Sequence, residues 1–451
     1  MCSPIVHIDF KIKILDCVGA SSMYYSTISL RRLAKIFILT SIGPQKEEIM
    51  DFNISEKMKT IIEMINEFVE KELIPLEAEF ITKDFKEMLP VLKEKQAMVK
   101  KMELWAPGFP KDCGGMGLNL VELGLVSEAL GRTPLGHYTF WCQAPDAGNI
   151  EILHQHGTNE QKEKWLKPLV NGDIRSCFSM TEVDMPGSNP IMLETTAVKD
   201  GDDYIINGHK WYTSSADGAD FAIVMAVTNP EANKYLQASM IIVPTDTPGY
   251  NLVRNIPVMG HEGSDYASHA EILYQSCRVP QSNLLGPEGH GFVIAQDRLG
   301  PGRIHHCMRW LGICRRSFDL MCHRANTRKI APDGKTLATR QMVQHWVADS
   351  AAEIQAARLM TLHAAWCIDT LGAKEARDQI SMIKYLVANT MQHVIDRALQ
   401  LHGGLGMTDD TILAYFYRHE RAARIYDGAD EVHRTSVGRR ILRQFEGKSI
   451  Q

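Results

Sequence analysis

Near the C-terminus, residues 425–434 combine an aromatic residue, an Asp-Gly pair and an acid-rich start of a helix (IYDGADEVHR). An ionised carboxylate such as that of Asp427 can act as a general base if it lies within hydrogen-bond reach of the proton it removes. Asp-Gly is also a common turn-forming pair, so a purely structural turn is the alternative for Asp427. Whether Asp427 is a general base or only part of a turn depends on which residues the other segments place beside it.

Two earlier segments carry hydroxyls and aromatic rings. Residues 177–182 (CFSMTE) place a hydroxyl and backbone amides at a predicted strand-to-loop bend, where they can hydrogen-bond a heteroaromatic ring. Residues 207–215 (NGHKWYTSS) begin with a predicted Asn-Gly turn and continue with two aromatic residues and three hydroxyls. Aromatic side chains can wall a flat cofactor, and hydroxyls can bond its polar edge. Taken singly, a Thr-Glu turn and a hairpin with core aromatics remain the simpler interpretations.

A fourth segment, residues 398–406 (ALQLHGGLG), ends a predicted helix with glycines. Glycine lets a ligand approach the backbone closely, but the same pattern is typical of a helix C-cap.

A metal site is conceivable where three cysteines follow two histidines on one helical segment. None of these residues has the spacing of zinc ligands, so buried small side chains are favoured and no metal is predicted. The residues are His305, His306, Cys307, Cys314 and Cys322.

The hydrophobic periodicity divides the chain into three predicted domains after residue 49. Residues 50–174 repeat apolar side chains at helical spacing, and residues 175–285 contain short β-branched runs separated by turn signals. Residues 286–451 return to long amphipathic helices. The predicted fold class is therefore α+β, mainly α, with an N-terminal helical domain, a central β-barrel domain and a C-terminal four-helix bundle.

Within these domains the pattern predicts the following elements. The helices of the first domain include 84–102, 118–130, 146–156 and 160–170, and the strands are 195–198, 204–206, 221–227, 239–243 and 270–274.

Composition excludes several classes of partner. The chain has 451 residues, with 49 Lys and Arg against 54 Asp and Glu, so it offers no basic surface for nucleic acid. No run reaches the roughly 18 apolar residues of a membrane helix, and no membrane span is predicted. The ten cysteines follow no disulfide pattern, which favours a reduced compartment.

Residues 1–49 differ from the rest of the chain, because they are Ser-rich and more basic than acidic before Glu47. A transit peptide would have this composition and would place the protein in the mitochondrial matrix. A misassigned start is the alternative: with Met50 as the true start, the protein would be cytoplasmic and of bacterial type.

From about Met50 to Phe445, the order and spacing of these segments resemble the acyl-CoA dehydrogenase family. The run 427–433 and the run 259–263 (MGHEG) look closest to the branch with family members ten and eleven and their bacterial relatives, which use Asp as base. The resemblance implies FAD, an acyl-CoA substrate, an electron-transferring flavoprotein as acceptor, and a homotetramer or homodimer. It also implies a role in fatty acid β-oxidation and lipid metabolism.

The resemblance assigns FAD contacts to both the β domain and the bundle. Around the isoalloxazine ring it implies Met180, Thr181, Trp211, Tyr212, Thr213 and Ser214. For the pyrophosphate and adenine of FAD in a neighbouring subunit, it implies Arg328, Gln400, Gly403 and Gly404. Tyr212 stands where most relatives have a stacking Trp, so either Tyr212 or Trp211 is expected to stack on the flavin.

On the substrate side, Asp427 matches the catalytic carboxylate, where most relatives carry Glu. It would take the α-proton of the thioester while the β-hydride passes to flavin N5, giving a trans-2-enoyl-CoA. The resemblance places Ser188, Arg303, Tyr426 and Gly428 beside the acyl-CoA. Some relatives hold the base on an earlier helix, but that position is Gly302 here.

Two alternatives remain at this point. One is a flavin oxidase on the same scaffold, acting on an acyl-CoA or a nitroalkane. The other is an inactive scaffold, which the departures from the family pattern at Tyr212, Glu262 and Ala331 would allow.

Overall fold

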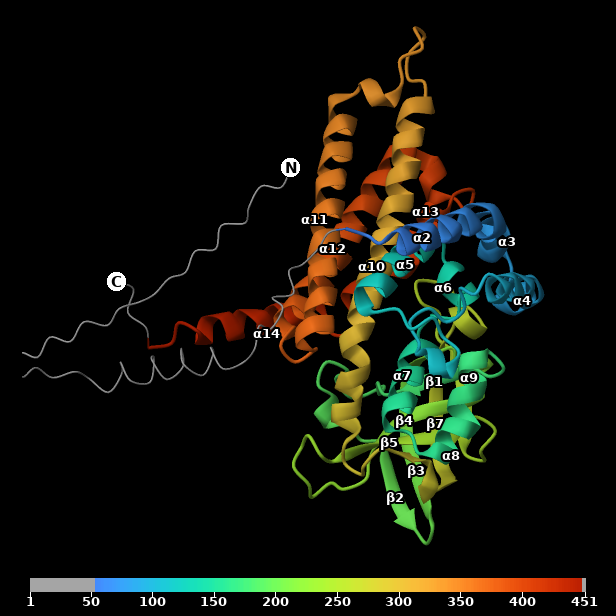
Figure 1. Ribbon diagram of the computed structural model, residues 1–451, viewed down its shortest axis with the longest axis vertical. Coiled ribbons are helices and arrows are strands. Elements are labelled where there is room, and N and C mark those ends of the chain that lie inside the picture. Colours follow the sequence, from blue (N-terminus) through green and yellow to red (C-terminus); the bar gives the residue numbers. More distant parts are fainter. Residues whose placement is uncertain (1–52, 448–451) are drawn as a thin grey trace, which may run out of the picture. The chain divides into compact units, whose positions relative to one another are not determined.

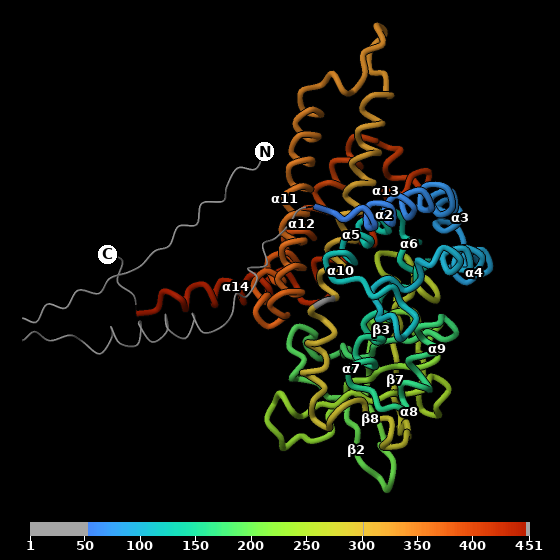
Figure 2. Tube along the Cα trace, viewed as in Figure 1, coloured from blue at the N-terminus to red at the C-terminus, as the bar shows by residue number. Residues whose placement is uncertain are grey.

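A computed structural model describes residues 53–447 of the chain. The predicted leader or misassigned extension, residues 1–49, lies outside this range. Figures 1 and 2 show an N-terminal group of helices, a sheet, and a bundle of long helices. The predicted fold class, mainly α with a β domain, is confirmed.

The first group of helices begins at Glu56 and is fixed by caps at several starts. Ser55 caps the first helix, and Asp84 with Glu87 forms a capping box at the start of another. Met58, Ile61 and Ile65 lie buried on one face. The elements are α2 (Glu56–Phe68), η1 (Val69–Leu73), η2 (Ile74–Leu76), α3 (Glu77–Thr82), α4 (Phe85–Lys101), η3 (Lys111–Cys113), α5 (Leu120–Leu130), α6 (Gly136–Thr139), α7 (Asp146–His156), α8 (Asn159–Gln161), η4 (Lys162–Leu166) and α9 (Lys167–Asn171).

The middle of the chain forms an eight-stranded sheet in the order β6-β7-β3-β2-β4-β5-β8, with β1 pairing parallel to β4. Strands β4 and β5 read as nearly continuous apolar runs because both of their faces are buried. The strands are β1 (Ser176–Ser179), β2 (Thr196–Asp200), β3 (Asp203–Ser214), β4 (Phe221–Val227), β5 (Ala238–Pro244), β6 (Tyr250–Asn255), β7 (His269–Pro280) and β8 (Leu284–Leu285); short turns η5 (Pro190–Met192), η6 (Ala216–Gly218), η7 (Asp265–Ala267) and η8 (Gln281–Asn283) join them.

The predicted strand 221–227 matches β4, and the other four predicted strands fall on β2, β3, β5 and β7, which are longer than predicted. The predicted turn at Asn207-Gly208 is wrong, because both residues lie inside β3 at a register shift against β7. A side chain at 208 would collide with Thr195, so glycine there serves close backbone approach instead of a turn. Strand β6 was not predicted; its residues are mostly exposed and lack alternating apolar side chains.

The C-terminal part is an antiparallel bundle built on one long helix, whose Trp310 is among the largest fully buried side chains. Cys307 and Cys314 are buried in this core as small apolar groups, as predicted, and Cys322 is half-buried. The elements are α10 (Gly291–Thr327), η9 (Leu337–Thr339), α11 (Gln341–Leu371), α12 (Arg377–His402), η10 (Gly403–Met407), α13 (Ile412–Glu420), η11 (Arg421–Arg424) and α14 (Asp430–Arg443). Among residues 53–447, no helix has the length and apolar character needed to span a membrane.

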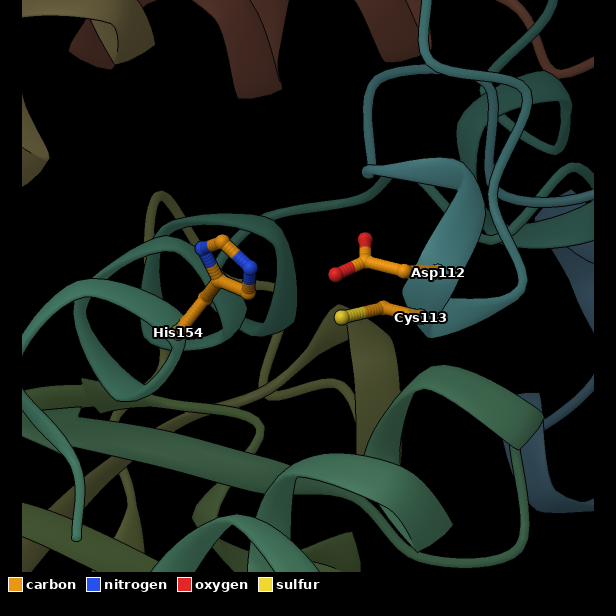
Figure 3. A group of neighbouring side chains, drawn as sticks. All are labelled: Asp112, Cys113 and His154. Carbon is orange, nitrogen blue, oxygen red and sulfur yellow. The ribbon is translucent and has the colours of Figure 1, made fainter. Parts of the chain in front are cut away.

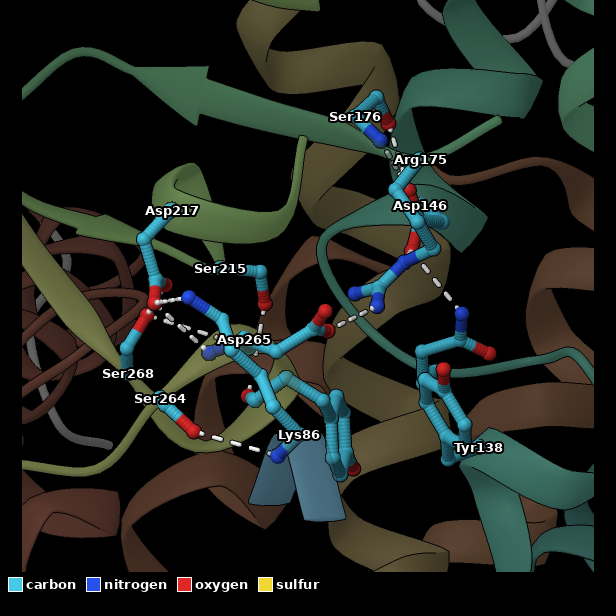
Figure 4. Close-up of polar contacts among 12 residues, drawn as sticks. Lys86, Tyr138, Asp146, Arg175, Ser176, Ser215, Asp217, Ser264, Asp265 and Ser268 are labelled. Carbon is cyan, nitrogen blue, oxygen red and sulfur yellow. Dashed lines mark hydrogen bonds and ion pairs between the residues drawn. The ribbon is translucent and has the colours of Figure 1, made fainter. Parts of the chain in front are cut away.

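The sheet is tied to the helices by the buried guanidinium of Arg175, just before β1 (Figure 4). It pairs with Asp146 on α7 at 2.8 Å and with Asp265 on η7 at 2.6 Å. The same guanidinium lies 5.2 Å from the centre of the Tyr138 ring. Asp146 also accepts hydrogen bonds from the backbone N–H and hydroxyl of Ser176, the first residue of β1. One side chain thus joins α6, α7, β1 and η7.

We expect Arg175→Met to lower the free energy of unfolding by about 3–5 kcal/mol, since it leaves two buried carboxylates without their cation. Urea unfolding followed by far-ultraviolet circular dichroism measures this. Arg278→Met is the matched control, because Arg278 also pairs with two carboxylates but its side chain is 51% exposed. The control should change stability by at most about 1 kcal/mol; equal losses in the two variants would contradict the role given to Arg175.

Candidate active site

The turn at Asp427 has a backbone that few residues adopt. Asp427 has φ +53° and Gly428 has φ +99°. A side chain at 428 would lie 2.6 Å from Nε2 of His433, so glycine is required both for its conformation and for space. The turn sits between η11 and the start of α14, and the strained backbone directs the Asp427 side chain toward α10, where its carboxylate meets His306.

Tyr426 anchors the turn to the bundle core. Its hydroxyl accepts hydrogen bonds from Arg309 at 3.0 Å and from the indole N–H of Trp310 at 3.1 Å. Arg309 is held in turn by both carboxylate oxygens of Glu420, at 2.5 and 2.8 Å. These contacts hold Tyr426, the residue directly before Asp427, in the bundle core.

Lys384 on α12 holds the other side of the turn. Its fully buried ammonium donates to the carbonyls of Ala423 and Gly428, both at 2.7 Å. Burial lowers the pKa of Lys384 to about 8, although the nearby carboxylates of Asp427 and Asp430 favour its charged form. The lysine thus spans the turn from η11 to the residue after Asp427.

The Asp427 carboxylate is surrounded by donors and cations. Its Oδ2 lies 3.2 Å from Nε2 of His306, and its backbone carbonyl accepts from Arg303 at 3.2 Å and from His433 at 3.1 Å. Burial alone would raise the pKa of Asp427, but the hydrogen bond and charge of His306 and the charges of Arg303 and Arg298 hold it well below its ordinary value. The carboxylate is therefore ionised at neutral pH.

Arg298 connects this turn to strand β1. Its guanidinium lies 4.1 Å from the centre of the Phe178 ring, and it donates to Asn149 on α7 at 3.2 Å. Its charge also acts on Asp427, so Arg298 links strand β1 electrostatically to the turn.

The segment after β1 is pinned against β3 by Lys210. This buried lysine donates to the Met180 carbonyl at 2.8 Å and to the Glu182 carboxylate at 2.9 Å. Glu182 also accepts from the backbone N–H groups of Glu194 and Thr195. Thr181 lines a shallow hollow with Met180, Glu182, Met185, Pro186, Gly187, Asn189, Pro190, Met192 and Leu193.

The two aromatic residues of the second segment lie at a bulge in β3. Tyr212 has φ +50°, and its side chain is 47% exposed. Trp211 is half-buried, and its indole N–H is buried without a partner in the described part of the chain. Next to them, the Ser214 hydroxyl pairs with Nδ1 of His269 at 2.8 Å, and Thr213 is buried against Ser179.

The residues predicted to reach a neighbouring subunit's FAD lie exposed at two helix ends. Arg328 follows α10, Gln400 lies near the end of α12, and Gly403 and Gly404 begin η10. Helices α10 and α12 pack against each other, and the charges of Arg324 and His323 near the end of α10 act on His402 at the end of α12. Gly403 has φ +63° and open space around its Cα.

The structure therefore brings four predicted substrate-side and catalytic residues together: Arg303, Tyr426, Asp427 and Gly428. Ser188 lies exposed in the loop after the Met180 segment. The sequence did not single out Lys384 or the pair of Arg309 and Glu420 as parts of the site. A signal for His306 existed, because Arg303, His306 and Trp310 recur at i, i+3 and i+7 on one face of α10.

A separate group of potential metal ligands lies between η3 and α7 (Figure 3). Ligand atoms of Asp112, Cys113 and His154 lie within 4.8 Å of one another, and this is the one such group among residues 53–447. Burial and the neighbouring Asp112 raise the pKa of the Cys113 thiol, which favours its protonated form. None of the three residues touches the Asp427 turn through a hydrogen bond of the described chain.

Comparison with known proteins agrees with this geometry. Models of the acyl-CoA dehydrogenase N-terminal, middle and C-terminal domains match residues 55–173, 177–277 and 289–442. Probable acyl-CoA dehydrogenase FadE2 of Mycobacterium tuberculosis is 43% identical over 404 residues, covering 87% of this chain and 97% of that protein. Acyl-CoA dehydrogenase family member 11 of Gallus gallus is 40% identical over 85% of this chain, which spans 50% of that protein's length.

A solved structure from Mycobacterium abscessus, assigned as an acyl-CoA dehydrogenase, superposes with a TM-score of 0.83. It is 37% identical and covers 87% of this chain and 100% of its own. The chain belongs to the acyl-CoA dehydrogenase family, whose members are FAD-dependent oxidoreductases acting on acyl-CoA.

The residues present fit FAD. The unpartnered indole N–H of Trp211 and the exposed ring of Tyr212 offer a polar contact and a flat wall at the bulge of β3. The open backbone at Gly403 and the exposed guanidinium of Arg328 suit a phosphate-bearing ligand.

We expect Lys384→Met to loosen the turn, because two carbonyls lose a charged donor worth about 1.5–3 kcal/mol per hydrogen bond. Amide hydrogen exchange of residues 423–433 should become at least about tenfold faster. Lys335→Met is the control, since Lys335 pairs with Asp333 on the surface. Exchange at 423–433 that matches the wild type would show that Lys384 does not hold the turn.

Proposed function

We propose that this protein catalyses the α,β-dehydrogenation of an acyl-CoA thioester to a trans-2-enoyl-CoA, with Asp427 as the base. The observation that carries this proposal is a partly buried carboxylate that contacts His306 and that His306, Arg303 and Arg298 keep ionised. A general base needs this combination of the ionised form and a fixed position.

Each part of the turn has a role in the proposed reaction. The Asp427 carboxylate takes the α-proton of the bound thioester. The backbone N–H of Asp427 has no acceptor within residues 53–447, so it is available to stabilise the negative charge that develops on the thioester oxygen. Bound FAD supplies the acceptor for the β-hydride. Arg303 and Tyr426 fix the turn while this charge moves.

FAD is proposed to lie between Met180, Thr181, Trp211, Tyr212, Thr213 and Ser214 of one subunit and Arg328, Gln400, Gly403 and Gly404 of another. The exposure of the second set supports a site shared across a homodimer or homotetramer. The proposed acceptor of electrons is an electron-transferring flavoprotein, and the proposed setting is fatty acid β-oxidation. Ser188 is proposed to contact the CoA arm.

Anaerobic titration with a panel of acyl-CoAs, followed by flavin absorbance at 450 nm, tests the reaction and its base. We expect at least one acyl-CoA to bleach the wild-type flavin. Asp427→Asn should slow this bleaching by at least about 10³-fold, because it removes the base while keeping a similar shape. Asp427→Glu should slow it by about 10–100-fold, because the added methylene displaces the carboxylate from its position beside His306.

Flavin content measured before each titration serves as the control. If Asp427→Asn bleaches at the wild-type rate, Asp427 is not the base. If the purified protein holds flavin and no acyl-CoA bleaches it, the dehydrogenase proposal fails. Reoxidation by air within seconds, without another acceptor, would identify an oxidase.

We expect Arg328→Ala to lose most of its FAD, because a guanidinium can bond phosphate oxygens in a bidentate manner and alanine cannot. The ratio of absorbance at 450 to 280 nm and the subunit mass from light scattering measure this. Lys329→Ala, at the adjacent exposed position, should keep both values. Unchanged flavin content and mass in Arg328→Ala would remove the support for a shared site.

A further inference from the structure

The imidazole of His306 is the nearest side chain to the Asp427 carboxylate that can donate a hydrogen bond to it. Nε2 of His306 lies 3.2 Å from Oδ2 of Asp427, and the two side chains are 16% and 21% exposed. The ring is enclosed by Trp310, at 6.0 Å between centroids and 21° between planes, and by Tyr426 at 5.3 Å. The imidazole therefore has little freedom to turn away.

Hydrogen-bonding chemistry decides which nitrogen of His306 carries the proton. An ionised carboxylate only accepts, so Nε2 must bear the hydrogen. Nδ1 is buried and has no partner within the described chain. Nε2 of His306 therefore faces Oδ2, which leaves Oδ1 as the free oxygen.

Helix α10 explains why the donor is found at this position. Gly302 occupies the place where some relatives carry the base, and His306 lies one turn later on the same face. The helix thus supplies a partner for the base instead of the base itself. Asp427 is one methylene shorter than the usual Glu, and the imidazole fills the distance between the helix and the shorter carboxylate.

Other charged or titratable groups, from each element packed nearby, surround the pair of His306 and Asp427. The guanidinium groups of Arg298, Arg303 and Arg309 belong to α10, and Lys384 belongs to α12. Burial lowers the pKa of His305 to about 3 and that of His433 to about 4, so both imidazoles are neutral. The remaining groups are Glu420 on α13, Asp430 on α14 and His137 on α6.

We infer that His306 is a positioning residue for the base: it holds Oδ2 of Asp427 and presents Oδ1 to the α-proton. This inference rests on the proposed role of Asp427. The arginines hold the backbone carbonyl or act at longer range, so they cannot fix the rotation of the carboxylate. His306 is the group that contacts it.

Two substitutions of similar polarity at position 306 distinguish the effect of the hydrogen-bond donor from the effect of the ring volume. His306→Gln can place an amide N–H near the position of Nε2, whereas the amide of His306→Asn is too short to reach Oδ2. His345→Asn, an exposed histidine on α11, is the control. The measurement is the rate of anaerobic flavin bleaching by a reactive acyl-CoA between pH 5 and 9, in all three variants and the wild type.

We expect His306→Asn to bleach about 100-fold more slowly, because the carboxylate can rotate away from the substrate. Its acid limb should also move to higher pH. The acid limb moves in this direction because only the ionised carboxylate can act as the base. His306 lowers the pKa of Asp427, so without the donor the carboxylate is protonated at a higher pH and the rate falls there. His306→Gln should stay within about tenfold of the wild type with little shift, and His345→Asn should match the wild type.

A double-mutant cycle of His306→Asn and Asp427→Asn on the thermal midpoint gives a readout that needs no reaction. Coupling between the two substitutions is expected. If the cycle shows no coupling, or if Asn and Gln at 306 give the same rate and the same pH profile, the inference is overturned. If Asp427→Asn keeps its activity while the cycle shows coupling, the contact stands and the proposed base is wrong, so the two failures are distinguishable.

Discussion

Burying a carboxylate costs several kcal/mol unless charges and donors replace the water it loses. The Asp427 turn meets this constraint through groups on three helices: His306 and Arg303 from α10, Lys384 from α12 and His433 from α14. The geometry of the turn depends on how these helices pack, because none of its partners comes from the turn itself.

A second set of contacts, made by two arginines, connects the sheet to the surrounding helices. Arg175 joins β1 to α6, α7 and η7, and Arg298 reaches from α10 to Phe178 on β1. Both guanidiniums use their planar shape to contact a ring and carboxylate or amide oxygens together. The strand that leads into the segment proposed to contact flavin is therefore held by charged groups whose own partners lie on neighbouring helices.

The sequence was informative where one local pattern decides the structure. Strand β4 was predicted with its observed bounds because one apolar run suffices, and helix α7 was also predicted with its observed bounds. The motif order identified the family and placed Asp427 on a turn. The predicted turn at Asn207-Gly208 was wrong, because the role of Gly208 depends on Thr195 across the sheet. Lys384 and His306 were missed as parts of the site because they lie 43 and 121 residues before Asp427 in the chain, and only packing brings them to it.

The space beside Gly302 has an evolutionary consequence. A side chain added there would meet nothing within 4 Å, and its helical backbone accepts any ordinary residue. A single substitution at 302 would therefore place a second carboxylate on α10 while the Asp427 turn keeps its contacts. A chain that holds both carboxylates is compatible with this packing. Under the proposed mechanism, the role of base can then pass from the turn to the helix without an inactive intermediate.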